Sequence, residues 1–192
     1  MTTRSNRLLT IGGLATLMAF LIGVLAYTAI ARPSGRPDAP FQLTSTRGET
    51  VNQSIFKGRP SLVYFGYTHC PEVCPTTLAE MTAWFEALGD EADGLDAYFI
   101  TVDPERDRPE DLKAYLSSFD PRITGATGDE ASIASAIKAY RVYAKKVPLD
   151  GGGYTMDHTA IVYLMGKDGR FVAPFNMKRR PNEAAEDLKR YL

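Results

Sequence analysis

The chain is 192 residues long, and its 22 basic residues nearly balance its 23 acidic ones. This balance leaves no basic field of the kind that attracts nucleic acid, so we expect no nucleic-acid partner. The part that follows an uncharged N-terminal run has the length and the mix of apolar and charged residues of about one globular domain.

The N-terminus has the pattern of a membrane anchor. Arg4 and Arg7 precede an uncharged run from Leu8 to Ile30. As a helix this run would extend about 35 Å, enough to cross a bilayer core of about 30 Å. The small-x-small triplet at 29–31 leaves cleavage open, but the apolar core of a cleavable signal is usually shorter, about 7–15 residues. We therefore predict a retained single-pass anchor at residues 1–31.

The positive-inside rule places Arg4 and Arg7 in the cytoplasm. We accordingly predict an inner-membrane protein whose soluble part faces the periplasm. Residues 32–40, RPSGRPDAP, are rich in Pro, Gly and charge and are interpreted as a tether. The folded domain is expected to cover residues 41–192.

Within the domain, buried strands and amphipathic helices alternate. The Pro109 region and the Thr127–Glu130 spacing carry helix-start signals, with Asp107 and Glu110 placed as a capping box. The predicted elements are two short strands around an Arg47–Gly48 turn, strands at 61–66 and 97–102, helices at 75–88, after 107 and at 131–146, a hairpin of strands at 159–165 and 170–175, and a helix at 183–192.

This order predicts an α/β fold with a mixed central sheet flanked by helices and an N-terminal β-hairpin. Functional groups of such sheets gather beyond the carboxyl ends of parallel strands. The strand at 61–66 ends there, directly before the two cysteines.

Cys70 and Cys74 are the only cysteines, and three residues separate them. If residues 70–74 form a helical turn, the two side chains share one face, with Cβ atoms about 5–6 Å apart. A helix N-terminus also favours thiolates. Three interpretations remain open: a structural disulfide, a redox dithiol and a metal site. The disulfide would gain only about 2 kcal/mol because its loop is short, and the usual redox motif has two intervening residues.

The chain has two histidines. His69 is adjacent to Cys70 and is expected to be an exposed loop side chain. His158 follows the glycine run 151–153 and is either a hydrogen-bonded residue at a strand end or a ligand. Two thiolates and one imidazole suit copper in both oxidation states, and zinc accepts the same donors.

Four separated blocks resemble one family, the Sco family (SenC-like proteins). They are GYTHCPEVCP at 66–75, TVDPERDRPEDLKAY at 101–115, ITGATG at 123–128 with the following AYRVYAKK, and YTMDHTAIVYLM at 154–165. Members of this family are membrane-anchored thioredoxin-fold proteins that assist cytochrome c oxidase assembly.

The resemblance implies a thioredoxin-like fold and a copper site formed by Cys70, Cys74 and His158. It also implies delivery of copper to the dinuclear copper centre of cytochrome c oxidase subunit II. Asp103, Arg106 and Asp107 match a family block without a ligand role, and we interpret them as structural, with helix capping as their task.

The leading functional interpretation is therefore a copper metallochaperone rather than an enzyme, with other periplasmic copper chaperones and thiol reductants as further candidate partners. The alternative is a thiol-disulfide reductase in which Cys70 and Cys74 are catalytic and reduce the cysteines of the acceptor before metallation. A peroxidase of the related thioredoxin-like class is a third hypothesis.

Overall fold

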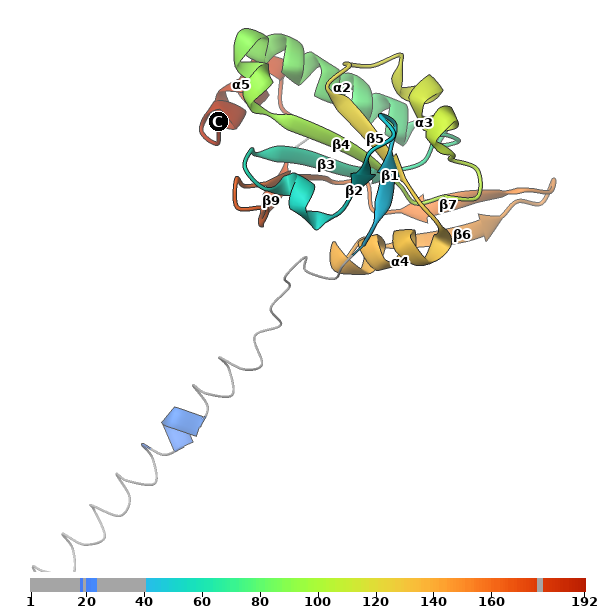
Figure 1. The fold of residues 1–192 in the computed structure, drawn as a ribbon, viewed down its shortest axis with the longest axis horizontal. Helices are drawn as coiled ribbons and strands as arrows, with labels where there is room; N and C mark the ends of the chain where they lie inside the picture. Colours follow the sequence, from blue (N-terminus) through green and yellow to red (C-terminus); the bar gives the residue numbers. More distant parts are fainter. Residues whose placement is uncertain (1–17, 19, 24–40, 176–177) are drawn as a thin grey trace, which may run out of the picture. The chain divides into compact units, whose positions relative to one another are not determined.

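The structure is a computed structural model that describes residues 18, 20–23, 41–175 and 178–192 (Figure 1). The chain divides into two compact units, Met1–Gly35 and Arg36–Leu192. In the first unit only residues 18 and 20–23 are described, and they are helical. No helix among the described residues is both long enough and apolar enough to span a bilayer. The predicted anchor, apart from those five residues, and the predicted tether lie outside the described part of the chain.

The domain contains strands and helices in an alternating order. They are β1 Leu43–Ser45, β2 Thr50–Val51, β3 Ser61–Gly66, α2 Val73–Leu88, β4 Asp96–Thr101, α3 Pro109–Leu116, β5 Ile123–Thr127, α4 Glu130–Ala139, β6 Ala144–Pro148, β7 Tyr154–His158, β8 Val162–Met165, β9 Phe171–Phe175 and α5 Pro181–Lys189, with 3₁₀ turns at Gln53–Phe56 and Gly89–Gly94.

Seven of the strands form one mixed sheet in the order β2-β1-β5-β4-β3-β8-β9. Strands β3, β4 and β5 are parallel, whereas β1 pairs antiparallel with β5 and β8 pairs antiparallel with β3. Figure 1 shows α2 and α3 on one face of this sheet and α4 on the other, and α5 packs against α2. The predicted α/β fold with a mixed sheet, flanking helices and an N-terminal hairpin is confirmed.

The core lies on both faces of β3, whose six residues are all buried. Burial on both faces explains the unbroken apolar run of this strand. On one side α2 contributes Leu78, Met81 and Phe85, each at most 1% exposed. This spacing follows one face of the helix, so α2 is fixed against the sheet and carries its N-terminus to the carboxyl end of β3.

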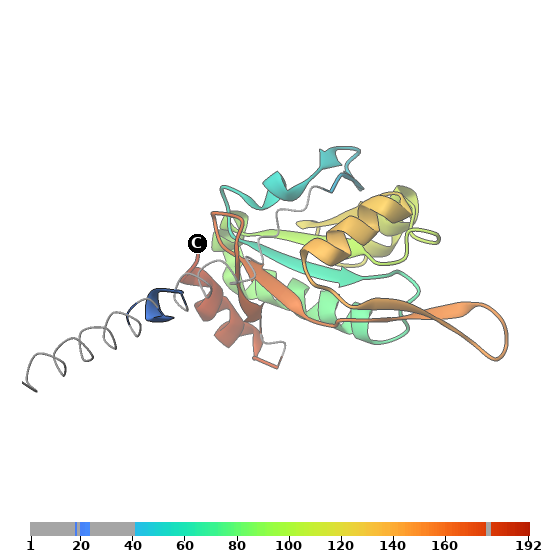
Figure 2. The ribbon, with the colours of Figure 1, turned by 90° about the horizontal axis from the view of Figure 1, so that it is seen from below.

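Strands β6 and β7 form a separate two-stranded sheet. Figure 2 shows this hairpin extending away from the body of the domain. The glycine run 151–153 makes its turn, and Gly152 and Gly153 have φ angles of 87° and 77°, which favour glycine.

The predicted helix at 131–146 is wrong over its second half. Helix α4 ends at Ala139, Arg141 adopts a left-handed φ of 52°, and residues 144–148 form β6. The prediction also missed β5 and β7. His158, predicted to lie between the glycine run and the next strand, is therefore the last residue of β7.

Two predicted caps are also wrong. The N-cap of α3 is Arg108, whose backbone N–H donates to Asp111 Oδ2 at 3.2 Å. The N-cap of α4 is Asp129, whose carboxylate accepts from Ser132 N at 2.7 Å. Asp107 is instead completely buried.

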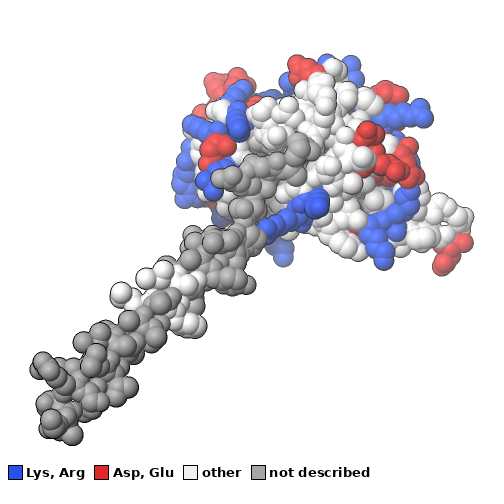
Figure 3. Space-filling model, turned by 60° about the horizontal axis from the view of Figure 1, so that its bottom comes forward, with Lys and Arg blue, Asp and Glu red and all other residues white. Residues whose placement is uncertain are grey.

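On the face shown in Figure 3, basic and acidic side chains are interspersed around a largely uncharged surface. This pattern agrees with the small net charge of −1.

Candidate metal site

The site begins where β3 ends. A Cβ atom on Gly66, the last residue of β3, would lie 2.8 Å from Cys74 Sγ and 2.7 Å from Cε2 of Phe99. These separations are shorter than van der Waals contact, so the Cys74 side chain can occupy its position only because residue 66 has no side chain. Glycine at the end of this strand is thus part of the site.

The two cysteines occupy different environments. Helix α2 begins at Val73, so Cys74 lies in its first turn, whereas Cys70 lies before the helix. Residues 70–74 thus do not form one helical turn, the condition under which the two thiols were expected to share a face. The thiols still approach each other, and Cys74 N donates to Cys70 Sγ at 3.4 Å. Cys74 is fully buried and Cys70 is partly exposed. Both are free thiols, so the structure contains no disulfide between them.

His158 reaches the cysteines from the β6–β7 hairpin. Its Nε2 atom lies 3.5 Å from Cys74 Sγ, and its Nδ1 atom lies 3.2 Å from the carbonyl oxygen of Thr159. A carbonyl oxygen can only accept, so Nδ1 carries the proton and Nε2 has a free lone pair directed at the thiols. This is the tautomer that a metal-binding imidazole requires.

One donor atom from each of Cys70, Cys74 and His158 lies within 4.8 Å of the other two. The prediction that these three residues come together is thus correct in geometry. Metal–sulfur bonds of about 2.3 Å place the donors of a three-coordinate site about 4 Å apart. The Cys74 Sγ–His158 Nε2 distance is already 3.5 Å, so adjustments of less than about 1 Å would convert this cluster into a coordination site.

Burial controls the protonation of the cluster. It raises the pKa of the Cys74 thiol from its ordinary value of 9.0 to about 12. It also lowers the pKa of His158 below its ordinary 6.5. Without a cation the site therefore holds a neutral imidazole and a protonated Cys74, and a bound cation would have to displace that proton.

Two tyrosines complete the walls of the site, and the sequence interpretation did not identify either of them. The Tyr64 hydroxyl donates to Cys74 Sγ at 3.5 Å. The ring of Tyr67 packs edge-on against the imidazole of His158, with centroids 5.6 Å apart. Both residues belong to the run SLVYFGY, whose apolar character concealed these polar contacts.

Asp107 supports the loop that carries the cysteines. Its carboxylate accepts from Thr68 N at 3.1 Å, from Thr68 Oγ1 at 2.6 Å and from Thr101 Oγ1 at 2.6 Å. Burial raises the pKa of Asp107 above its ordinary 3.8, while these hydrogen bonds act in the opposite direction. His69 is exposed as predicted, with its Nδ1 atom 3.0 Å from Thr68 Oγ1, and it is not part of the three-donor cluster.

The donor set fits a soft metal ion. Thiolates select copper(I), imidazole binds both copper states, and a three-donor set leaves a position open for another ligand. The same donors accept zinc, for which closed structural sites usually have four protein ligands. Among the described residues, no fourth His, Cys, Asp or Glu joins this cluster.

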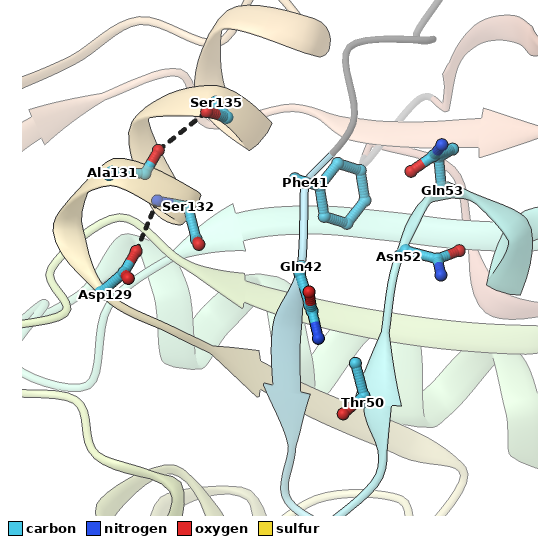
Figure 4. Close-up of a pocket in the computed structure, with 9 residues that line it drawn as sticks. All are labelled: Phe41, Gln42, Thr50, Asn52, Gln53, Asp129, Ala131, Ser132 and Ser135. Carbon is cyan, nitrogen blue, oxygen red and sulfur yellow. Dashed lines mark hydrogen bonds between the residues drawn. The ribbon is translucent and has the colours of Figure 1, made fainter.

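A groove of about 550 Å³ lies elsewhere, between α4 and the β1–β2 hairpin (Figure 4). Polar groups on the helix side of the groove already form hydrogen bonds with neighbouring residues of the same segment. Asp129 accepts from Ser132 N, and Ser135 Oγ donates to the carbonyl oxygen of Ala131. None of the three donor residues lines it.

A mixed α/β sheet with a cysteine–cysteine–histidine cluster at the carboxyl end of a parallel strand defines a metal- or thiol-active domain of the thioredoxin-like class. The SCO1/SenC family model matches residues 31–192. The chain belongs to this family, and the predicted resemblance is confirmed.

The chain is similar to known Sco proteins in both sequence and structure. The mitochondrial SCO1 homolog of Homo sapiens is 37% identical over 170 residues, which are 84% of this chain and 55% of that protein. The chain thus spans about half the length of this relative. The structure of Bradyrhizobium japonicum ScoI with copper bound is 61% identical, with a TM-score of 0.77 over 80% of this chain and 98% of that chain. A more distant structure is that of BsSco, a member of the Sco family of cytochrome c oxidase assembly proteins. It is 25% identical, with a TM-score of 0.63 over 82% of this chain and 94% of that chain.

Proposed function

We propose that the protein is a copper metallochaperone that holds copper through Cys70, Cys74 and His158 and delivers it to the dinuclear copper centre of cytochrome c oxidase subunit II. The observation that carries this proposal is the convergence of two sulfurs and an unprotonated imidazole nitrogen within 4.8 Å. The copper-bound ScoI structure supports the choice of metal, and the family of BsSco supports the choice of acceptor complex.

The three donors differ in access, and this difference suggests an order of release. Cys74 is fully buried, whereas Cys70 is partly exposed. A ligand from the acceptor can therefore approach on the Cys70 side while Cys74 and His158 still hold the ion. Transfer would proceed by exchange of one ligand at a time, with Cys74 released last.

A direct test is transfer to the acceptor. The copper-loaded full-length chain is mixed with the reduced copper-binding domain of subunit II, and metal is measured in each protein after separation. We expect copper to move to the acceptor. Retention of all copper by the chain, with an acceptor that accepts free copper normally, would contradict delivery.

A second candidate is a thiol-disulfide reductase, and the unequal exposure of the cysteines favours it. Cys70 would attack an acceptor disulfide, with Cys74 N donating a hydrogen bond to its sulfur. Cys74 would then resolve the mixed disulfide, so that the dithiol becomes a disulfide and the acceptor gains two thiols. Reduction of the oxidised acceptor by the metal-free chain, unaffected by His158→Ala, would favour this function.

The location of the protein belongs to the same proposal. Residues 1–31 would anchor the chain in the inner membrane, residues 32–40 would act as the tether, and residues 41–192 would face the periplasm, where copper chaperones and thiol reductants could also meet it. The uncharged run Leu8–Ile30 supports this arrangement. A reporter active only in the periplasm, fused to the C-terminus, should be active. Activity of a cytoplasmic reporter instead would contradict it.

A further inference from the structure

The donors of the candidate site come from two parts of the domain. The cysteines lie at the junction of β3 and α2, in contact with the seven-stranded sheet. His158 lies on the β6–β7 hairpin, which pairs only with itself among the described strands. Four residues after His158, Val162 pairs with Tyr64 of β3, so the main sheet holds the chain just beyond the imidazole. The start of β7 has no such pairing with the main sheet, and another element must hold it.

The segment Asp103–Asp107, hereafter the clamp loop, contacts both parts. It lies between β4 and α3. On the cysteine side, Asp107 receives three hydrogen bonds, two of them from Thr68, which is two residues before Cys70. The buried Asp107 carboxyl thus connects the end of the clamp loop to the segment that precedes Cys70.

On the histidine side, the clamp loop holds Tyr154, the first residue of β7. Arg106 Nη1 donates to the Tyr154 carbonyl oxygen at 3.0 Å, and the Tyr154 hydroxyl donates to Asp103 Oδ1 at 2.8 Å. The guanidinium carbon of Arg106 lies 3.8 Å from the centroid of the Tyr154 ring, within cation–π distance. Arg106 Nε in turn forms an ion pair with Asp103. Tyr154 is thus held by its backbone, its ring and its hydroxyl.

A second contact continues from Arg106 toward the imidazole. The guanidinium carbon is 5.7 Å from the centroid of Tyr67, and the Tyr67 ring packs edge-on against His158. The Tyr67 hydroxyl also forms a 2.8 Å hydrogen bond with Thr155 Oγ1 on β7. The clamp loop therefore acts on the hairpin at both Tyr154 and Thr155.

Stability alone does not account for this arrangement. Asp103 is 2% exposed, and the Nη2 atom of Arg106 is buried with no hydrogen-bond partner among the described residues. The Arg106 side chain is 24% exposed, and a partly buried ion pair with an unpaired polar atom is a weak source of folding free energy. The exposed ion pair between Lys146 and Glu105 also contributes little to the free energy of folding. A hollow of about 200 Å³ lies between α4, the hairpin and the clamp loop, so helix packing does not fill the space beside the hairpin there.

We propose that the clamp loop is a positioning element of the metal site: Asp107 fixes the cysteine loop, and Asp103 and Arg106 fix the start of β7 at Tyr154. Together with the β3–β8 pairing beyond His158, this five-residue segment sets the separation between His158 and the thiols. This inference rests on the proposed three-ligand copper site. Asp103, Arg106 and Tyr154 are positioning residues, because none of them belongs to the donor cluster.

The test is a double-mutant cycle on the full-length chain. Copper(I) affinity is measured by competition with a chromophoric chelator for the wild type, Arg106→Ala, His158→Ala and the double variant. Loss of an outer-shell partner typically lowers metal affinity about 10–100-fold, and we expect a loss in this range for Arg106→Ala. When His158 is already alanine, Arg106→Ala should cause almost no further loss of copper affinity, because Arg106 acts through His158. Additive losses would overturn the proposal.

Two further variants separate positioning from general damage. Arg108→Ala makes the same substitution two residues along the chain at an exposed side chain, and it should leave the affinity unchanged. An equal loss in this control would overturn the proposal. Tyr154→Phe removes only the hydroxyl, which contacts Asp103 Oδ1 at 2.8 Å and Glu105 Oε2 at 3.3 Å. It should give a smaller loss of copper affinity with unchanged circular dichroism.

A readout on the metal-free chain keeps this test independent of the proposed function. The imidazole signals of His158 in nitrogen-resolved NMR should shift and broaden in Arg106→Ala, while the alkylation rate of Cys70 stays within about twofold of the wild type. Unchanged imidazole signals would overturn the positioning role. If His158→Ala alone leaves copper affinity unaltered, the three-ligand function fails, and the NMR result still decides whether Arg106 positions His158.

Discussion

Cys74 Sγ and His158 Nε2 lie 3.5 Å apart, although 84 residues separate them in the chain. The sulfur belongs to a helix packed on the main sheet, and the nitrogen belongs to a hairpin outside that sheet. Their proximity depends on a glycine beneath the sulfur, on two tyrosines beside the donors and on the clamp loop. Each of these supports can be tested separately.

Gly66→Ala should distort the site. Its Cβ would lie 2.8 Å from Cys74 Sγ and 2.7 Å from the Phe99 ring, so either side chain must shift. Overpacking of this kind typically costs about 1–3 kcal/mol of unfolding free energy. Urea denaturation and copper affinity should both show a loss. Gly94→Ala, whose nearest neighbour would be a flexible leucine carbon at 3.4 Å, is the matched control. Equal effects at the two glycines would contradict this explanation.

Tyr64→Phe should weaken copper binding while the fold is retained. The ring is fully buried and would still fill its space, but the hydrogen bond to Cys74 Sγ would be lost. A hydrogen bond of this kind is worth about 1 kcal/mol, which corresponds to a loss in affinity of about fivefold. Chelator competition measures it. An affinity equal to that of the wild type would show that the hydroxyl does not act on the thiolate.

The two cysteines should differ strongly in reactivity when the chain is reduced and metal-free. Cys70 is partly exposed, whereas Cys74 is buried with a pKa of about 12. At pH 8 Cys74 would therefore be almost entirely protonated, whereas the thiolate is the form that reacts. Iodoacetamide followed by peptide mass spectrometry should therefore find the label on Cys70 first. Comparable labelling of both residues would contradict the described environments, and copper should protect both.

Asp107→Asn tests the cysteine side of the clamp loop through pH. Burial raises the pKa of the folded-state carboxyl above 3.8, so the native chain binds a proton more readily than the unfolded chain does. Ionisation of Asp107 thus penalises the native state at neutral pH, and acidification through the raised pKa toward 3.8 removes this penalty. The stability of the wild type relative to the asparagine variant should therefore increase between pH 7 and pH 4, as measured by urea denaturation. A relative stability that falls over this range would refute the burial effect.

The sequence predicted the strands and helices whose apolar patterns are strong, among them β3, α2 and the β8–β9 hairpin. It missed β5 because ITGAT contains small residues that do not suggest a strand. The structure explains the glycine, since a Cβ on Gly125 would lie 2.8 Å from Cδ1 of Leu116 in α3. It also missed β6, because neither proline nor glycine marks the end of α4. The chain turns there at Arg141, a residue type that rarely adopts a positive φ.

The three candidate donors were predictable from residue type and the family resemblance, but their supports were not. Asp107 has the spacing of a helix cap, and only the folded chain shows that its carboxylate faces Thr68 and Thr101. Arg106 and Tyr154 are 48 residues apart, and their contact depends on the path of a hairpin that was predicted as helix and loop. Long-range polar contacts of this kind leave no periodic signal in a sequence.

The most direct test of the three-ligand site is an anaerobic copper(I) titration of the reduced full-length chain, with His158→Ala and a Cys70→Ser, Cys74→Ser double variant. We predict one copper per chain for the wild type. We expect His158→Ala to lower the copper affinity by at least about tenfold, since loss of a ligand should cost no less than loss of an outer-shell partner. We expect the double-serine variant to bind no copper. Binding that is equally tight with and without the imidazole of His158 would contradict the account.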